Sequence, residues 1–213
     1  MYFDYEKQVE SSRFYNVGKT VAAFLTPFVY DFRCYGKENI PLSGPLIIAC
    51  NHIGSTDPAL IIANCPRKIF FMAKSELFEN GMSALLVNQM NAFPVKRNAL
   101  DRKALKYAVK VLENGFVLGI FPEGRTVKEL VPTEAKSGVA YLADKTGADV
   151  LPVCIYRNPD EKKKRHKLVL RFGRVIKNNS LFERSDNRST DIRKAADIIM
   201  NEIIRMWEEE HCR

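Results

Sequence analysis

The sequence lacks the features of a secreted or membrane-spanning protein. Its N-terminus is acidic and aromatic, without the basic start and apolar run of a secretory leader. The most apolar early stretch, 21–30, is interrupted by Pro27 and is shorter than the roughly 18–20 residues of a membrane span. We therefore expect a cytoplasmic protein that does not cross a membrane and touches one only peripherally, from the cytoplasmic face.

Several common site patterns are also missing. The five cysteines are an odd number without a C-x-x-C pair, so neither a disulfide framework nor a zinc knuckle is indicated. Cys50, Cys65 and Cys154 stand beside apolar residues, and we expect buried, unreactive thiols. Since the sequence has no Walker loop, no G-x-G-x-x-G and no H-E-x-x-H, we expect no metal and no bound cofactor.

Acidic residues are fewer than basic ones, 25 against 33, which gives a formal charge of +8. Such a balance favours an anionic partner: nucleic acid, an acidic membrane surface or a phosphorylated small molecule. The basic run 162–167 is expected to be a solvated hairpin tip; the alternative is contact with lipid headgroups or an acidic carrier.

The first 33 or so residues predict a helix with a kink at Pro27. Apolar residues recur there at spacings of three and four and share one face: Phe14, Val17, Val21, Phe24, Leu25, Phe28 and Phe32. This face either packs against the rest of the protein or lies in a lipid interface, an option that the nearby Arg13, Lys19 and Arg33 keep open.

The remaining pattern alternates short apolar runs with helical periodicity. Strands are expected at 46–50, 69–72, 116–121, 150–155 and 167–176, the last with a bulge at Gly173. Helices are expected at 58–64, 75–87, 98–113 with Asn98 as N-cap, 133–145 and 190–210. This order predicts an α/β fold, a largely parallel central sheet flanked by helices, with an N-terminal amphipathic helical element.

One histidine stands where α/β proteins place ligands. His52 directly follows the predicted strand 46–50, at the end of a parallel strand. Asp57 comes five residues later, and Gly54 permits the loop to fold back. Asp57 either only caps the helix that begins at Pro58 or also meets the imidazole. In the second case the pair suits general-base work.

Two further motifs are expected at the same rim. In Phe121–Thr126, Glu123 and Gly124 predict a tight turn that exposes backbone N–H groups, and Arg125 can grip a phosphate. Ala92–Arg97 adds two cations, Lys96 and Arg97. Because no G-x-S-x-G elbow is present, the nucleophile is expected to be a substrate hydroxyl, which points to direct group transfer.

Together these residues resemble the PlsC-type glycerolipid acyltransferases, represented by 1-acylglycerol-3-phosphate acyltransferase. The blocks that match are N-H-x4-D at Asn51, His52 and Asp57, F-P-E-G at Phe121–Gly124, an arginine-bearing block at Phe93–Arg97 and a short block at Leu151–Val153. The similarity spans roughly residues 38–156. The family usually reads E-G-T-R where this chain has its arginine one position earlier, at Arg125, and often Asp where Lys96 stands.

The resemblance implies a reaction and a role for each matched residue. His52 would deprotonate the free hydroxyl of a lysophospholipid, lysophosphatidic acid above all, and Asp57 would hold His52. The alkoxide would attack acyl-CoA or acyl-carrier protein. Arg97 and Arg125 would bind the acceptor phosphate, and Glu123 with Gly124 would shape that site. Residues 1–35 would dock on an anionic membrane surface, and 36–213 would form the acyltransferase domain.

Three rival functions remain at this stage. The acceptor can be another lysolipid, an amine-containing lipid or glycerol 3-phosphate, which the shifted Arg125 motivates. A non-catalytic lipid or nucleic-acid binder would use the net charge of +8, but the aromatics line an apolar helix face, so we expect no nucleic acid. A hydrolase would use His52 to activate water. Acyl-chain length, donor type and oligomeric state are open.

Overall fold

A computed structural model of the protein describes residues 3–5, 9–10, 12–79, 81–96, 101–127, 131–158, 166–182 and 185–212. Its strands are β1 (Asp31–Tyr35), β2 (Leu46–Cys50), β3 (Ile69–Lys74), β4 (Ala92–Val95), β5 (Val117–Ile120), β6 (Asp149–Asn158) and β7 (Lys167–Phe172). They form one sheet in the order β1-β7-β6-β2-β5-β3-β4. All neighbours pair parallel except β6 and β7. The predicted α/β class and largely parallel sheet are confirmed.

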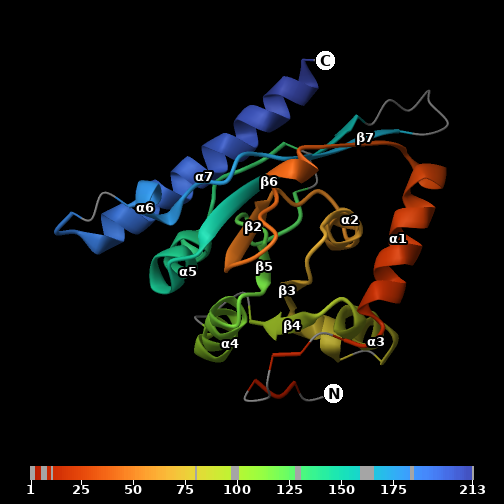
Figure 1. Ribbon diagram of the computed structural model, residues 1–213, viewed down its shortest axis with the longest axis horizontal. Coiled ribbons are helices and arrows are strands. Elements are labelled where there is room, and N and C mark those ends of the chain that lie inside the picture. Colours follow the sequence, from red (N-terminus) through yellow and green to blue (C-terminus); the bar gives the residue numbers. More distant parts are fainter. Residues whose placement is uncertain are drawn as a thin grey trace.

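Helices cover both faces of this sheet (Figure 1). They are α1 (Tyr15–Val29), α2 (Asp57–Asn64), α3 (Gly81–Gln89), α4 (Arg102–Glu113), α5 (Gly138–Thr146), α6 (Asn178–Leu181) and α7 (Arg188–His211), with short 3-10 turns η1 (Lys37–Asn39) and η2 (Ser75–Phe78). No helix in this described part of the chain has the length and apolar character that a membrane crossing requires.

The alternation of side chains along β2 assigns each helix to a face. Ile47 and Ala49 belong to the core that α4, α5 and α7 complete. Leu46, Ile48 and Cys50 point the other way, into the core shared with α2 and the start of α1. Burial on both faces explains why β2 is an unbroken apolar run rather than an alternating one.

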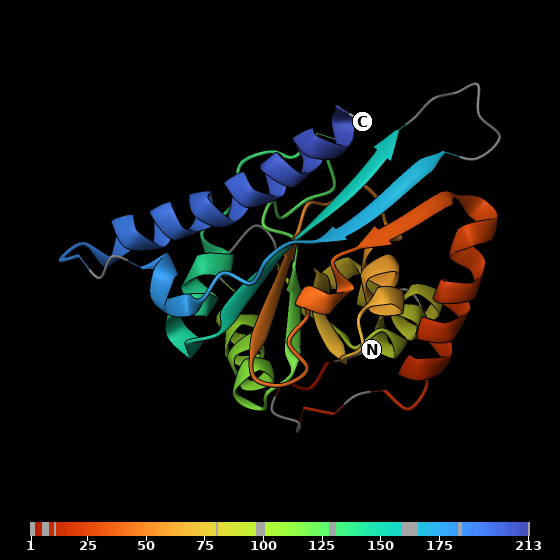
Figure 2. The ribbon, with the colours of Figure 1, turned by 45° about the horizontal axis from the view of Figure 1, so that its top comes forward.

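The helix α1 stands at one edge of the molecule, apart from α4 and α5 (Figures 1 and 2). Its inward residues are Tyr15 and Thr26, which are buried, with Lys19 between them. The Tyr15 hydroxyl accepts a hydrogen bond from Ile69 N, and Lys19 Nζ donates one to Cys65 O. Polar groups on Tyr15 and Lys19 thus fix this helix to the domain.

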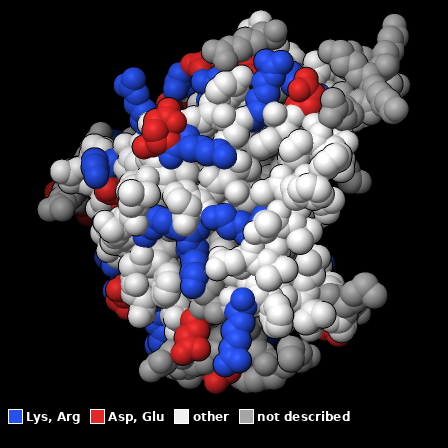
Figure 3. Space-filling view, turned by 45° about the vertical axis from the view of Figure 1, so that its right-hand side comes forward, with Lys and Arg blue, Asp and Glu red and all other residues white. Residues whose placement is uncertain are grey.

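The apolar side of α1 faces outward. The exposed residues on it are Phe14, Val17, Val21, Phe24, Leu25, Phe28 and Val29, each at least half exposed. Figure 3 brings this side forward, and its right-hand flank shows a broad area without charged side chains. The apolar face that could have packed against the domain is therefore left open.

Several predicted boundaries are wrong for local reasons. The N-terminal helix ends at Val29, and the next residues form the edge strand β1, so the element predicted at 1–35 contributes its end to the sheet. The helix expected at 75–87 is divided into η2 and α3. The helix expected from 98 starts at Arg102, because the Asp101 carboxylate accepts from Ala104 N and caps it; Asn98 lies outside the described residues.

Two strands differ from expectation at the sheet margins. The strand β4 was not predicted, since Pro94 argues against a strand; here it is an edge, where a proline is tolerated. The strand expected at 167–176 ends at Phe172, and Gly173 N then donates to Pro152 O. A Cβ at Gly173 would lie 3.0 Å from Met206 Sδ, so the chain passes close under α7 there.

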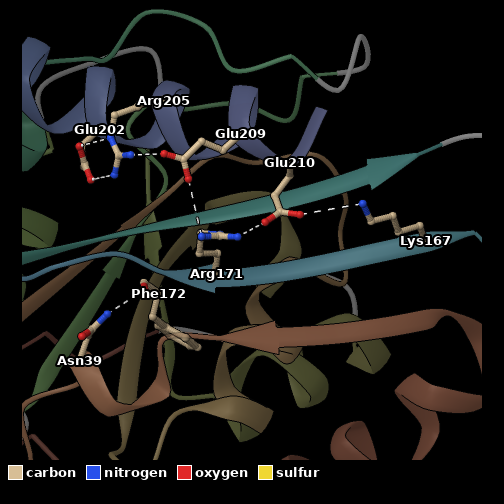
Figure 4. Close-up of polar contacts among 8 residues, drawn as sticks. All are labelled: Asn39, Lys167, Arg171, Phe172, Glu202, Arg205, Glu209 and Glu210. Carbon is tan, nitrogen blue, oxygen red and sulfur yellow. Dashed lines mark hydrogen bonds and ion pairs between the residues drawn. The ribbon is translucent and has the colours of Figure 1, made fainter. Parts of the chain in front are cut away.

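An ionic network fastens the C-terminal half of α7 to β7 (Figure 4). Glu210 is only 2% exposed and pairs with Arg171, and its other oxygen lies 3.9 Å from Lys167 Nζ. Glu209 lies 3.7 Å from the same guanidinium and also pairs with Arg205. These contacts hold the long helix over the part of the sheet where the antiparallel pair runs.

Candidate active site

The site begins where β2 ends, and a side-chain amide sets its position. Asn51 is fully buried, its Nδ2 donates to Ile155 O at 2.9 Å and its Oδ1 accepts from Ile155 N at 2.8 Å. This pair continues the contact between β2 and β6 after their last ladder partners, Cys50 and Val153. The next residue, His52, is therefore placed at a rigid point on the sheet rim.

His52 and Asp57 meet as the second interpretation of the sequence proposed. Asp57 Oδ2 lies 2.8 Å from His52 Nδ1 and also accepts from Ile53 N at 2.7 Å and Gly54 N at 2.8 Å. The loop folds back over the carboxylate, which explains why three donors converge on one oxygen. The predicted capping role is wrong, because the N-cap is Thr56 and Asp57 begins the helix. With Nδ1 engaged, Nε2 of His52 is the nitrogen left for a substrate proton.

An aromatic stack fixes the imidazole plane. The His52 ring lies 4.0 Å from the Phe121 ring at 19°, and Phe121 lies 5.7 Å from Phe71 at 18°. A Cβ at Gly119 on β5 would stand 2.2 Å from Cε1 of Phe71 on the neighbouring strand β3, so only glycine leaves room for the Phe71 ring. His52 is buried, at 8% exposure, and its ring stacks on Phe121, the first residue of the Phe-Pro-Glu-Gly turn.

Glu123 holds the two halves of the site together through the backbone. Its Oε2 accepts from His52 N at 2.7 Å and its Oε1 from Thr133 N at 2.8 Å. The carboxyl is 4% exposed, and burial raises its pKa above the usual value, against the lowering effect of these hydrogen bonds. Glu123 thus acts as a positioning residue. No sequence signal pointed to the bond with His52, because it joins residues far apart in the chain.

Gly124 forms the predicted tight turn with φ +68°, and its N–H donates to Phe121 O at 3.0 Å. A Cβ here would lie 3.0 Å from Cδ, Cε and Nζ of Lys136. Lys136 is itself anchored, since its backbone N donates to Pro122 O at 2.8 Å. The structure thus places over the turn a cation that sequence reasoning missed. The sequence put Lys136 inside the helix predicted at 133–145, whereas α5 begins only at Gly138 and leaves Lys136 in the segment before it.

Of the two arginines predicted to bind a phosphate, only Arg125 lies in the described part of the chain. Arg125 is exposed beside the turn and is not among the side chains that line the groove next to His52. Arg97 lies outside the described residues, so its predicted role is untested. Among the described residues no cluster of three or more His, Cys, Asp or Glu side chains is arranged to hold a metal ion.

A groove of about 900 Å³ opens from His52 along the face that carries α4 and α5. Its apolar lining comes from alternate positions of the strands and from the two helices: Met72, Val95, Ile120, Leu105, Val109 and Val139. Basic side chains stand among these, from Lys96 at the end of β4 to Lys136 and Lys145 at α5. The site therefore combines a held imidazole, a cation and an apolar space, the parts that transfer of an apolar group to a hydroxyl requires.

The thiols take no part in this arrangement. All five cysteines are free, and Cys50, Cys65 and Cys154 are buried as expected. Burial raises the pKa of the thiol of Cys50, the last residue of β2, so the reactive thiolate form is disfavoured.

Comparison with known proteins agrees with this chemistry. The Acyltransferase family profile matches residues 31–156. The chain is 34% identical over 148 residues to the 1-acyl-sn-glycerol-3-phosphate acyltransferase of Bacillus subtilis, covering 68% of this chain and 73% of that protein. It is 32% identical over 123 residues to the enzyme of that name from Borreliella burgdorferi, covering 57% and 49%.

A solved structure shows the same fold. The 1-acyl-sn-glycerophosphate acyltransferase PlsC from Thermotoga maritima superposes with a TM-score of 0.71 at 24% identity, over 93% of this chain and 78% of that one.

Proposed function

Because the chain belongs to the Acyltransferase family, we propose that it moves a fatty acyl group from an acyl thioester to the free hydroxyl of 1-acylglycerol 3-phosphate, giving phosphatidic acid for phospholipid biosynthesis. The observation that carries this proposal is the 2.8 Å contact between His52 Nδ1 and Asp57 Oδ2, in a groove with an apolar lining. The donor is acyl-CoA or acyl-carrier protein, and no further cofactor takes part in the proposed reaction.

The reaction proceeds by direct transfer. Nε2 of His52 takes the proton of the acceptor hydroxyl while Asp57 stabilises the imidazolium that forms. The alkoxide oxygen attacks the thioester carbonyl, a tetrahedral oxyanion forms, and the carbon–sulfur bond breaks. The imidazolium then returns its proton to the departing thiolate, so the products are an ester and a free thiol.

Lys136 is the proposed partner of the oxyanion. The backbone N–H groups of His52, Ile53, Gly54 and Gly124 all donate within the protein, to Glu123, Asp57 or the turn itself. The side chain that lies over the turn beside His52 is a lysine, and a positioned donor at a developing oxyanion contributes about 3–4 kcal/mol.

The acceptor side of the proposal involves a membrane. Arg97 and Arg125 remain the predicted ligands of the acceptor phosphate, with Glu123 and Gly124 shaping the turn that presents Arg125. The open apolar face of α1 supports residues 1–35 as a docking element on an anionic bilayer, with residues 36–213 as the acyltransferase domain. We place the enzyme at the cytoplasmic face of the membrane as a peripheral protein.

His52→Ala tests the base assignment. We expect kcat for transfer of an acyl group to 1-acylglycerol 3-phosphate to fall by about 10²–10⁴-fold, the usual contribution of a positioned base. His211→Ala is the matched control, because His211 lies at the end of α7, stacked on Trp207. Products are identified by mass spectrometry, and retained transfer by a folded His52→Ala protein contradicts the assignment.

A panel of acceptors tests the substrate. The shifted Arg125 favours one alternative, transfer to a different lysolipid or to another phosphorylated acceptor. We expect the highest kcat/KM with 1-acylglycerol 3-phosphate when each acceptor is offered with one acyl thioester. Release of free fatty acid at the same rate without any acceptor would instead identify a hydrolase.

A further inference from the structure

The groove beside His52 is longer than catalysis at the imidazole requires. A second hollow of about 410 Å³ shares Ser137, Tyr141, Lys145 and Ile192 with it and reaches Arg188 at the start of α7. The space therefore runs from His52, past the first turn of α5, to the N-terminal end of α7.

The lining of the groove is both apolar and basic. Besides its apolar residues, the lining includes five basic side chains: Lys96, Arg102, Lys106, Lys136 and Lys145. The acidic side chain in its lining is Asp101, whose carboxylate already accepts from Lys96 N and Ala104 N. A ligand with an apolar or neutral arm and an anionic end matches this combination of apolar and basic lining.

The groove and α1 lie on opposite faces of the sheet. The groove is lined by strand side chains, such as Met72 and Ile120, that point to the face of the sheet covered by α4 and α5. The helix α1 packs with α2 on the other face. Figures 1 and 2 show α1 at one side and α4 with α5 at the other. If α1 contacts the bilayer, the groove lies on the face of the sheet away from α1, and a water-soluble substrate can reach His52 through it.

We propose that the outer groove binds the phosphate of the acyl donor's phosphopantetheine arm, at the end away from the thioester, through Lys106 and Lys145, with Arg188 closing its far end against Asp144. This assignment rests on the proposed function. Phosphopantetheine is common to coenzyme A and to carrier proteins, so the groove chemistry is the same for both. The pantetheine arm lies along the apolar lining, and the thioester reaches His52 and Lys136.

The test compares two double charge reversals. Lys106→Glu/Lys145→Glu alters the outer groove; Lys103→Glu/Lys37→Glu makes the same change in net charge at exposed residues outside it. We expect the first variant to raise KM for the donor by about ten-fold or more, with kcat at saturating donor and KM for 1-acylglycerol 3-phosphate unchanged. The control variant keeps the wild-type KM values, and Lys106→Arg/Lys145→Arg restores them.

Three donors separate the sources of the phosphate. Acyl-CoA and acyl-carrier protein both carry it, and whichever shows the lower KM with the wild-type protein is the donor that the groove serves. S-acyl-pantetheine has no phosphate, so its KM is expected to be equal in the wild-type and groove variants. A rise in KM for the acceptor instead of the donor overturns the proposal, because the groove would then hold the lipid.

Isothermal titration calorimetry in the absence of an acceptor measures donor binding separately from catalytic activity. Coenzyme A and 4′-phosphopantetheine are titrated into wild-type protein and the groove variant, and we expect binding to weaken by about ten-fold or more in the variant. Equal binding to both proteins, or binding to neither, refutes the donor site. Failure of the wild-type protein to acylate any acceptor refutes the proposed function instead, whatever the titration gives.

Discussion

At the scale of single residues, the two carboxylates of the site differ in how far sequence could predict them. The pairing of Asp57 with His52 was foreseeable, because the residues are five apart and Gly54 lets the loop turn. The role of Glu123 was not, because its bond to His52 N crosses 71 positions of the chain and depends on β2 and β5 lying side by side. Lys136 was missed for the same reason.

Glu123 makes stability depend on pH. Its raised pKa means that the folded protein binds the proton more tightly than the unfolded chain, so the free energy of unfolding declines as pH rises from the usual value of 4.5 through the raised one. We expect Glu123→Gln, which cannot ionise, to lack this decline. We also expect the activity of Glu123→Gln to fall. The glutamine amide can accept from only one of the backbone N–H groups of His52 and Thr133 and points its own NH₂ donor at the other.

Urea denaturation at several pH values between about 4 and 7 measures this difference. Glu134→Gln is the control, since the Glu134 side chain is 92% exposed. Parallel pH profiles for the wild-type and Glu123→Gln proteins would be inconsistent with the assigned cause.

At the scale of elements, periodicity predicted where helices and strands lie but not which side of α1 faces the protein. The apolar spacing of α1 is the same whether the face packs inward or lies against lipid, and Tyr15, Lys19 and Thr26 decide the matter by contacts with distant residues or the helix itself. Short elements at the sheet margin, β1 and β4, were missed because an edge strand needs neither a continuous apolar run nor an uninterrupted set of donors.

The outward face of α1 predicts how membrane binding depends on sequence. Phe24 and Phe28 are 65% and 67% exposed, so replacing both by serine leaves the fold intact but removes apolar area that would enter the lipid interface. We expect at least about a ten-fold loss in the partition coefficient for phosphatidylglycerol vesicles. Co-sedimentation with vesicles measures this loss.

The matched control replaces exposed apolar residues elsewhere, Leu42→Ser with Ile198→Ser. Equal partitioning of the two double variants would show that α1 has no special part in binding. Activity toward a water-soluble, short-chain acceptor is expected to be the same in both, since neither pair lies in the groove.

At the scale of the whole molecule, the fold is held together across its faces by more than apolar burial. The helix α7 spans the sheet from the groove, at Ile192, to the far end of β7, where Glu210 meets Arg171 (Figure 4). A sequence cannot show this pairing, because charged residues on a long helix are usually solvated. Here Arg171 on β7 lies under the helix and pairs with Glu210 (Figure 4).

Glu210→Gln tests this fastening. Removing the charge of a carboxylate that is 2% exposed should lower the free energy of unfolding by about 1–3 kcal/mol, since it weakens a charge-assisted hydrogen bond and leaves Arg171 less compensated. Glu209→Gln, at a side chain 39% exposed, should cost less than about 1 kcal/mol. Urea unfolding compares them; an equal cost would mean that burial of Glu210 adds nothing.

The placement of α1 and of the long groove on opposite faces of one sheet also governs how the products depart. Under the proposed reaction, the freed thiol leaves through the groove into water. The doubly acylated lipid instead diffuses laterally into the leaflet without leaving the membrane. Neither product blocks the other's exit. One docked molecule can then convert many neighbouring lipids before it detaches, so its rate should follow the surface density of acceptor rather than its bulk concentration.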